Sequence, residues 1–423
     1  MPDATKTVKR FLPQSEFGRN VVTLMTGTVI AQAIPIAISP ILTRLYSPEE
    51  FGLFALYMGL AAILSVIVTG RYEQAIMLPA DDDDAANLVV LSVAITVIIS
   101  LLVLLLIFLS SSNIASALEK PEIEAWLFLL PVTIFLTGIY QTLNYWNNRK
   151  KQYKTLAKNR IYQSTTMSIA HIGGGFISGS GIFLIFGDLI GKFTSAFFLA
   201  LNTFKKDSSS FIDIKKDKQI SLAKRYKKFP IFDTGAALAN VSSYQIQNIL
   251  FPIFYGLSSA GFYFLVLRVL QAPLSLISTS LTDVYKQKLT DPKTTDDDLK
   301  RYYKKMFVFL FSIGLPPLVL FMFIGEELFS FVFGSEWRVA GEYAVMLAPM
   351  FFIKFIASPL SYFLYLKEKQ EANIIMQTLF IITSVYAITY MDSISTTIYF
   401  ISFAFSIVYI LYIIYSARLA KIF

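Results

Sequence analysis

Two stretches of this chain, residues 19–78 and residues 228–287, follow the same plan 209 positions apart. In each, a long apolar segment leads into a short turn, and a second long apolar segment follows. The turn at residues 46–52 aligns with the turn at residues 255–261, and both run from a tyrosine to a glycine. A hydrophobic chain that repeats at its midpoint is how many membrane carriers build two lobes around a central path.

Further along the chain the two halves still align, but the offset between aligned positions becomes slightly larger. Pro131 aligns with Pro349, and residues 151–152 align with residues 369–370, at an offset of 218. A longer loop in the second half explains the nine-position drift. The identities are few, so chance resemblance between apolar stretches is the alternative. The matching order of spans and turns favours duplication.

The composition is typical of a membrane protein. Hydrophobic residues make up 55% of the 423 positions and charged residues only 16%, whereas an ordinary soluble domain carries about 25% charge. Since a bilayer-crossing helix needs about 20 apolar residues, the sequence predicts an all-α polytopic fold with about twelve transmembrane helices. The predicted spans are residues 20–44, 51–78, 88–110, 124–147, 159–179, 181–201, 229–254, 259–284, 306–328, 340–366, 373–391 and 394–417.

The distribution of basic residues predicts the orientation. With the polar N-terminus inside, the inner segments carry most of the 37 Lys and Arg residues, as the positive-inside rule requires. The net charge of +8 then reflects mainly orientation and contact with anionic lipids. Nucleic-acid binding is not expected, because the sequence predicts no soluble domain to carry it. Three basic residues fall at outer ends and four near membrane depth: Arg44, Lys120 and Arg338, and Arg71, Lys192, Arg268 and Lys354.

Residues 205–228 form the only sizeable polar break, and they fall at the midpoint. They predict a basic inner linker between an N-terminal six-helix lobe, residues 1–204, and a C-terminal six-helix lobe, residues 229–423. The outer loops are short, which argues against a membrane polymerase or glycosyltransferase with a catalytic domain outside the bilayer. The acidic run at residues 81–84 could hold a metal ion, but a helix start is favoured because the helix dipole stabilises carboxylates there.

Bond chemistry has little support in the sequence. The chain has no cysteine and a single histidine, His171, which limits metal and nucleophile sites. A structural, hydrogen-bonded role is favoured for His171 over a proton relay. No phosphate-binding loop or dinucleotide motif occurs. We therefore expect neither an enzyme nor a bound cofactor, although coupling to protons or sodium stays open.

Ionisable residues inside a membrane are costly, so each one is a functional hypothesis. Arg268 is the strongest candidate because guanidinium stays charged and binds phosphate oxygens with two prongs; a snorkelling or structurally paired arginine is the alternative. Lys354 has no carboxylate near it in sequence, so it should face a watery interior or a partner helix. Arg71, near the inner end of the second span, is a weaker substrate contact, and its neighbour Glu73 should point to another helix face.

Asp188 and Lys192 stand four residues apart on the sixth span, which places them on one helix face. Mutual neutralisation explains them without a substrate and is the favoured interpretation. They remain the best candidates for ion coupling if transport is coupled to protons or sodium.

Two segments carry a family resemblance. Residues 51–56, followed by residues 71–79, resemble the polysaccharide-repeat flippases, also called O-antigen or Wzx-type translocases, of the multidrug/oligosaccharidyl-lipid/polysaccharide exporter superfamily. Residues 268–274 are similar to the Arg-then-Pro pattern on the eighth helix of this family and of the related lipid II flippases. The resemblance extends over nearly the whole chain in span count, orientation and loop pattern.

The resemblance implies two six-helix lobes in a V around a central cavity. It also implies transport of an undecaprenyl-diphosphate-linked oligosaccharide from the inner to the outer leaflet, for O-antigen, capsule or exopolysaccharide synthesis. Arg268 matches the family's cavity arginine. The implied setting is the bacterial cytoplasmic membrane with both termini inside, where the polysaccharide polymerase and other assembly proteins would be partners. The predicted twelve spans depart from lipid II flippases, which carry two further helices.

A cation-coupled drug or metabolite antiporter of the same superfamily is the alternative function. Its cavity should be rich in carboxylates to hold a cationic load. The predicted membrane-depth set is instead mainly cationic, with Lys192, Arg268 and Lys354 against one clear acid, Asp188. This balance favours an anionic substrate.

Overall fold

The structure is a computed structural model that describes residues 16–289 and 295–422. Inside these ranges, the side chains of residues 16–22, of Gln370 and of several residues between 272 and 288 are not described. The basic segment at residues 1–15 and the side chain of Pro273, which belongs to the eighth-helix pattern, therefore lie outside the description.

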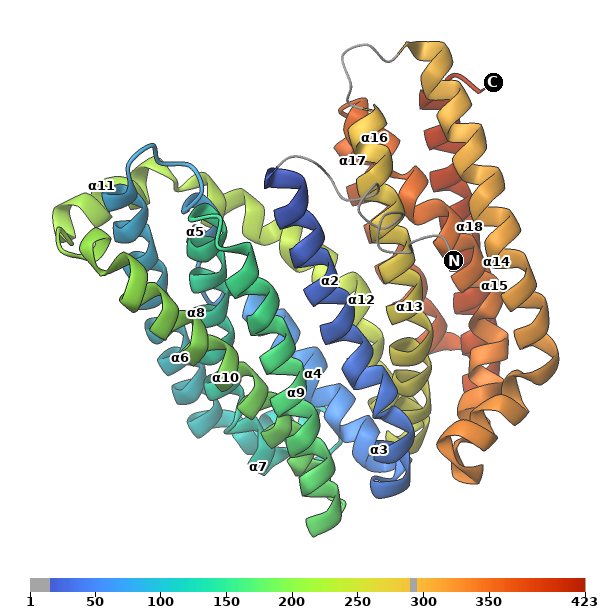
Figure 1. Cartoon of the computed structure of the whole chain (residues 1–423). Helices are drawn as coiled ribbons and strands as arrows, with labels where there is room; N and C mark the ends of the chain where they lie inside the picture. Colours follow the sequence, from blue (N-terminus) through green and yellow to red (C-terminus); the bar gives the residue numbers. More distant parts are fainter. Residues whose placement is uncertain (1–15, 290–294, 423) are drawn as a thin grey trace, which may run out of the picture.

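The described residues form helices and no strands, which confirms the all-α prediction (Figure 1). Six long helices build the N lobe and six build the C lobe. Those of the N lobe are α2 (Glu16–Ala37), α4 (Pro48–Ile67), α6 (Asp82–Ala117), α8 (Leu130–Arg149), α9 (Tyr153–Ile177) and α10 (Ile182–Asp207). Those of the C lobe are α12 (Thr234–Tyr255), α13 (Leu257–Leu289), α14 (Asp296–Phe333), α15 (Arg338–Leu360), α17 (Gln370–Tyr390) and α18 (Ile394–Leu419).

Not all of these helices are apolar enough to be recognised as spans by length and composition. In the described ranges eight helices meet this criterion. A ninth span is counted if α8 and the segment before it, which contains α7 (Glu124–Leu127) and is bent by 47° from α8, cross the membrane together. The remaining long helices are α9, α12 and α13. Of α13, the stretch Leu257–Gln271 is apolar but shorter than a span.

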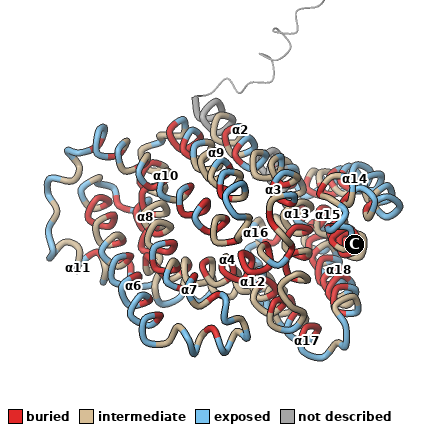
Figure 2. The backbone as a smooth tube through the Cα atoms, turned by 90° about the horizontal axis from the view of Figure 1, so that it is seen from below, coloured by how far each residue is buried: buried red, intermediate tan, exposed pale blue. Residues whose placement is uncertain are grey.

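The internal repeat is visible in the way the helices pack. In the N lobe α2 packs on α9, α6 on α8, and α10 on both α8 and α9. In the C lobe the equivalent helices make the same contacts: α12 with α17, α14 with α15, and α18 with both α15 and α17. The matching helix order confirms the predicted duplication. The equivalent helices α6 and α14 lie outermost, and Figure 2 shows their outward faces exposed, as lipid-facing apolar helices require.

The structure corrects one part of the repeat alignment. Lys151, which follows α8, has a left-handed backbone with φ 54°. In the second half the residue with the same conformation, at φ 53°, is Glu368 and not Lys369. The same backbone hydrogen bond follows in both places, from Gln152 to Asn147 and from Lys369 to Leu364. The true offset there is 217. Aligning identical residue types misplaced the offset by one position, because the two turns share their backbone geometry but differ in their side chains.

The two repeat turns meet each other where the lobes join. A Cβ added at Gly52 would lie 1.9 Å from the carbonyl oxygen of Leu257, and one added at Gly261 would lie 1.8 Å from that of Pro48. Pro48 and Leu257 are themselves 209 positions apart, so the contact is reciprocal about a pseudo-twofold axis. Ser258 also donates a hydrogen bond to Glu49, its counterpart in the other lobe. Glycine is needed here because the backbones touch.

Further contacts close this end of the molecule, the lower end in Figure 1. Trp337 donates its ring N–H to the carbonyl of Thr43 at 2.9 Å, and its ring meets that of Phe51 edge-on at 5.0 Å. Arg44 donates to the carbonyl of Val332 at 2.9 Å. We call this the turn end.

The opposite end, which we call the basic end, carries Lys150 and Lys151 after α8, the short helix α11 (Lys216–Arg225) and the C-terminus. The predicted linker is therefore partly helical: α11 packs on α6. Lys218 lies 2.7 Å from Asp84, and this hydrogen bond raises the pKa of Lys218 above its usual value.

Candidate functional site

A cavity of about 520 Å³ lies between the two lobes. Both lobes contribute to its walls, through α2 and α9 on one side and α12 and α13 on the other. Its lining residues are Ala31, Gln32, Pro35, Ile36, Ser164, Tyr244, Gln245, Asn248, Phe264, Leu267, Arg268, Gln271 and Ser275. Arg268 is the single charged residue among them.

Arg268 is held in place by the break in the first span. Pro40 has no N–H to donate, so the helix is interrupted between α2 and the short helix α3 (Ser39–Leu45). Next to the break, the carbonyl of Pro35 accepts hydrogen bonds from the Ser39 hydroxyl at 2.7 Å and from Arg268 Nη2 at 3.1 Å. In the described part of the chain no carboxylate forms an ion pair with Arg268.

The cavity lies on one side of the pseudo-twofold axis because the lobes do not meet symmetrically. Helix α12 packs closely along α4, where a Cβ on Gly59 would lie 3.1 Å from Ile249. The equivalent pair, α2 and α13, makes only a short contact. Arg268 therefore lies at the contact between α2 and α13. This contact is less extensive than the one between α4 and α12, although the internal repeat makes the two pairs equivalent.

Arg71 lies outside this cavity and is bound by carboxylates. The second predicted span ends early, with α4 stopping at Ile67, and Arg71 has a left-handed backbone at φ 62°. Its Nε lies 2.7 Å from Asp233 Oδ2, and its Nη1 lies 3.5 Å from Glu73 Oε1. The prediction that Arg71 and Glu73 do not pair was wrong because it assumed a continuous helix there.

Lys354 is on α15, in the interior of the C lobe. Its ammonium lies over the rings of Tyr244, 5.5 Å from the centroid, and of Phe351, 5.6 Å away. It lines two small chambers, one of which shares Tyr244, Leu267 and Gln271 with the Arg268 cavity. Lys354 therefore adjoins the cavity but is not one of the residues that line it.

Asp188 and Lys192 form the predicted ion pair, with Lys192 Nζ 2.5 Å from Asp188 Oδ2 on one face of α10. His171 is also engaged: its Nε2 is 2.8 Å from the carbonyl of Leu184, and Tyr46 donates to its carbonyl at 2.6 Å. The close packing of Gly187 on the imidazole agrees with a structural histidine.

The acidic run at residues 81–84 begins α6, as expected for a helix start. Asp82 lies 3.0 Å from Arg149 and 2.6 Å from Lys150. Within residues 16–289 and 295–422, no cluster of three or more metal-ligating residue types is found.

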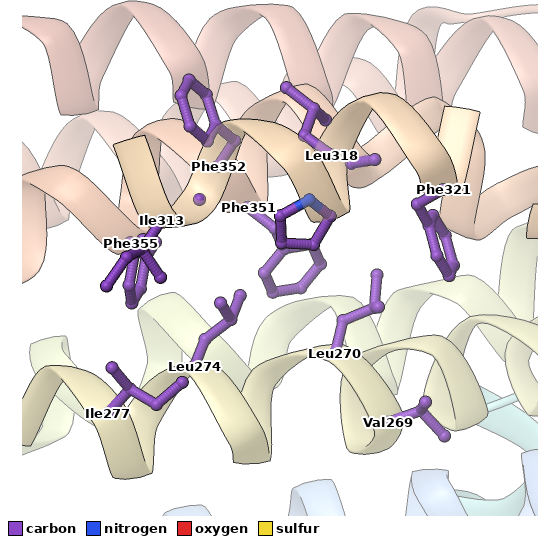
Figure 3. A pocket seen from close by; sticks show the side chains of 13 residues that line it. Val269, Leu270, Leu274, Ile277, Ile313, Leu318, Phe321, Phe351, Phe352 and Phe355 are labelled. Carbon is purple, nitrogen blue, oxygen red and sulfur yellow. The ribbon is translucent and has the colours of Figure 1, made fainter. Parts of the chain in front are cut away.

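A second pocket, of about 220 Å³, is entirely apolar and lies on another face of α13, between it and helices α14 and α15 (Figure 3). Leu270 and Leu274 point into it from α13, and Phe351 and Phe355 from α15. Among the described residues no polar side chain lines this pocket, in contrast to the cavity that Arg268 lines.

Sequence reasoning did not identify most of the polar residues that surround Arg268. Gln32, Tyr244, Gln245, Asn248 and Gln271 all line the cavity. A signal was present, because 264, 267, 268, 271 and 275 repeat at helical spacing on α13 and mark one face of that helix. Choosing that face as the cavity wall required knowing which helices pack on the other faces.

Comparison with known proteins agrees with this architecture. The chain is similar to a multidrug-resistance MATE transporter in an inward-facing conformation, with a TM-score of 0.70 and 14% identity over 93% of this chain and 94% of that one. It is equally similar to the lipid II flippase MurJ in an inward closed conformation, at 0.70 and 14% over 94% and 87%. At this identity the likeness shows the fold.

No curated protein matches the sequence. A family model described as "Polysaccharide biosynthesis protein" matches residues 41–342. The family match confirms the resemblance to polysaccharide biosynthesis proteins, and the two solved structures show that the chain shares their fold. The match extends over more than half of the chain, which therefore belongs to the polysaccharide biosynthesis protein family.

Proposed function

We propose that this protein is a flippase that moves an undecaprenyl-diphosphate-linked oligosaccharide from the inner to the outer leaflet by alternating access. The observation that carries the proposal is the 520 Å³ cavity between the lobes with Arg268 as its one charged lining residue. The guanidinium can bind a diphosphate with two prongs. Family membership supports a glycan as the cargo.

The same cavity disfavours the drug-antiporter alternative. A cationic drug needs a carboxylate, and none is among the thirteen lining residues. Asp188, the clearest acid at membrane depth, is already neutralised by Lys192. An anionic head group is the better match to this electrostatic environment.

We place the basic end in the cytoplasm of a bacterial cell, with the protein in the cytoplasmic membrane and both termini inside. The lysines at that end would then contact anionic lipids. The closed turn end would face outward, so the structure corresponds to an inward-facing state that receives the head group from inside. The polysaccharide polymerase and other assembly proteins are the partners expected on this pathway.

The orientation can be tested with single cysteines, because the chain has none of its own. Lys215, just before α11, and Glu122, between α6 and α8, are both exposed. With an impermeant thiol reagent on intact cells, Glu122→Cys should be labelled and Lys215→Cys should be labelled only after permeabilisation. Strong labelling of position 215 in intact cells would reverse the proposed orientation.

We retain Asp188 and Lys192 as candidates for proton or sodium coupling and test them as a pair. Removing one partner of a buried ion pair costs about 3–5 kcal/mol, whereas removing both is far less costly. Asp188→Asn alone should therefore lower the amount of folded protein, and Asp188→Asn combined with Lys192→Met should restore it. If the pair is only structural, the double variant should export glycan at the wild-type level per folded molecule. An export rate that no longer responds to a proton or sodium gradient would instead assign the pair to coupling.

Deletion of the gene tests the function itself. We expect one surface glycan to disappear and its lipid-linked repeat unit to accumulate on the cytoplasmic side. Complementation with the wild-type gene should reverse both effects. An unchanged glycan profile together with increased sensitivity to cationic drugs would favour the antiporter.

A further inference from the structure

Lys354 is a cation at membrane depth without a carboxylate partner in the described part of the chain. Two aromatic rings, Tyr244 and Phe351, are the groups placed against its ammonium. A cation–π contact offsets only part of the cost of placing a charge at membrane depth. Its position therefore calls for a further counter-charge.

Space for a counter-ion exists next to the ammonium. A chamber of about 110 Å³ adjoins Lys354 and is lined mainly by hydroxyl, amide and aromatic groups. Ser361 and Asn373, which follow α15 and begin α17, place this chamber toward the basic end. Tyr412 donates to Asn373 Oδ1 at 2.6 Å, and Asn373 Nδ2 donates to the Tyr365 hydroxyl at 2.8 Å, which leaves one amide N–H of Asn373 as a donor. The remaining lining residues are Tyr244, Ala357, Ser358, Phe380 and Tyr409.

Apolar groups lie on another side of Lys354. Phe351 touches Lys354 on one side and lines the apolar pocket between α13, α14 and α15 on the other (Figure 3). A smaller chamber of about 40 Å³ leads toward Gln271 and the Arg268 cavity. The ammonium therefore adjoins two chambers, and the 110 Å³ chamber is the more polar of the two.

We propose that Lys354 and the 110 Å³ chamber form a binding site for one compact anionic group, the size of chloride or a carboxylate. The chamber is smaller than a cavity of about 150 Å³ that accepts a benzene ring, so it suits a compact group better than a whole sugar ring. The anion can be free in solution, or it can be the carboxylate of an acidic sugar on the cargo. The second source rests on the proposed function, and the first does not.

The test compares thermal unfolding of the purified protein in sodium chloride, sodium acetate and sodium glucuronate. A ligand that binds only the folded state raises the Tm as its concentration rises. Wild type should gain about 2–4 °C more than Lys354→Gln in at least one of these salts. Lys354→Arg, which keeps the charge, should retain most of the gain. Arg338→Gln, which removes an exposed cation paired with Glu326 and Glu327, should behave like wild type and controls for general salt effects.

The pattern across salts identifies the source. A gain in chloride and acetate supports a free anion, and a gain in glucuronate alone supports the acidic sugar. If Lys354→Gln does not fold, Ser361→Leu provides the second variant, because it fills the chamber and keeps the lysine, and it should lose the gain. Equal Tm shifts in wild type and in the variant that folds, for all three salts, would overturn the proposal and leave Lys354 as a structural cation.

Discussion

Replacing Arg268 with alanine is expected to reduce glycan export at least tenfold per molecule of inserted protein. Hydrogen bonds to charged groups contribute about 1.5–3 kcal/mol, which corresponds to roughly 10- to 150-fold in binding. Because Arg268 is the one charged residue lining the cavity, nothing else there replaces its contribution. The measurement is surface glycan in a deletion strain complemented with each variant, normalised to membrane-inserted protein.

Two further variants separate charge from geometry. Arg268→Lys keeps the charge but loses the fork, so export should be intermediate. Arg71→Ala should be milder than Arg268→Ala in export per folded molecule, because Arg71 is bound to Asp233 and Glu73 away from the cavity. Full glycan export by Arg268→Ala would make this arginine structural and Lys354 the next candidate for contact with the substrate.

The second large effect is expected at the crossing of the repeat turns. In Gly52→Ala the new methyl group would lie 1.9 Å from the carbonyl oxygen of Leu257, well inside contact distance. The turn end must then separate, at a cost of about 1–3 kcal/mol or more. This cost is paid only in the state closed at that end, so the equilibrium should shift toward opening outward and export should fall.

An impermeant thiol reagent measures this shift directly. Gln32→Cys, which places the thiol in the cavity wall, should be labelled faster from outside when Gly52→Ala is also present. Gly173→Ala is the matched control, because this helical glycine has nothing within 4 Å of an added Cβ. Wild-type labelling and export in Gly52→Ala would mean that the contact between Gly52 and Leu257 is not part of the transport cycle.

Several features of the fold were predictable because they depend on local sequence. Most of the long helices follow from the length of the apolar segments, and the repeat follows from the order of those segments around two similar turns. The Asp188–Lys192 pair was predicted from spacing alone, since residues four apart share a helix face. Each of these features needs only the chain's own periodicity.

Predictions failed where the backbone leaves regular structure. Arg71 was assigned to a continuous span, but the chain turns after Ile67 and passes through a left-handed conformation that brings Arg71 to Glu73. The offset at Lys151 was misplaced by one for a similar reason, because the left-handed turn, and not the residue type, is what the two halves share. Backbone geometry of this kind is only weakly encoded in single side chains.

The sequence by itself determined the number and order of the helices, the duplication and the residues that carry charge into the membrane. Only the tertiary structure decided which of these charges are already paired. Asp233 lies 162 positions from Arg71 yet neutralises it, whereas Arg268 meets a carbonyl, that of Pro35, and Lys354 meets aromatic rings. In the tertiary structure α2 and α13 also make only a short contact, whereas the equivalent helices α4 and α12 pack closely. The physical reason is that pairing and packing depend on which helix faces meet, and residues far apart in the chain make that choice together.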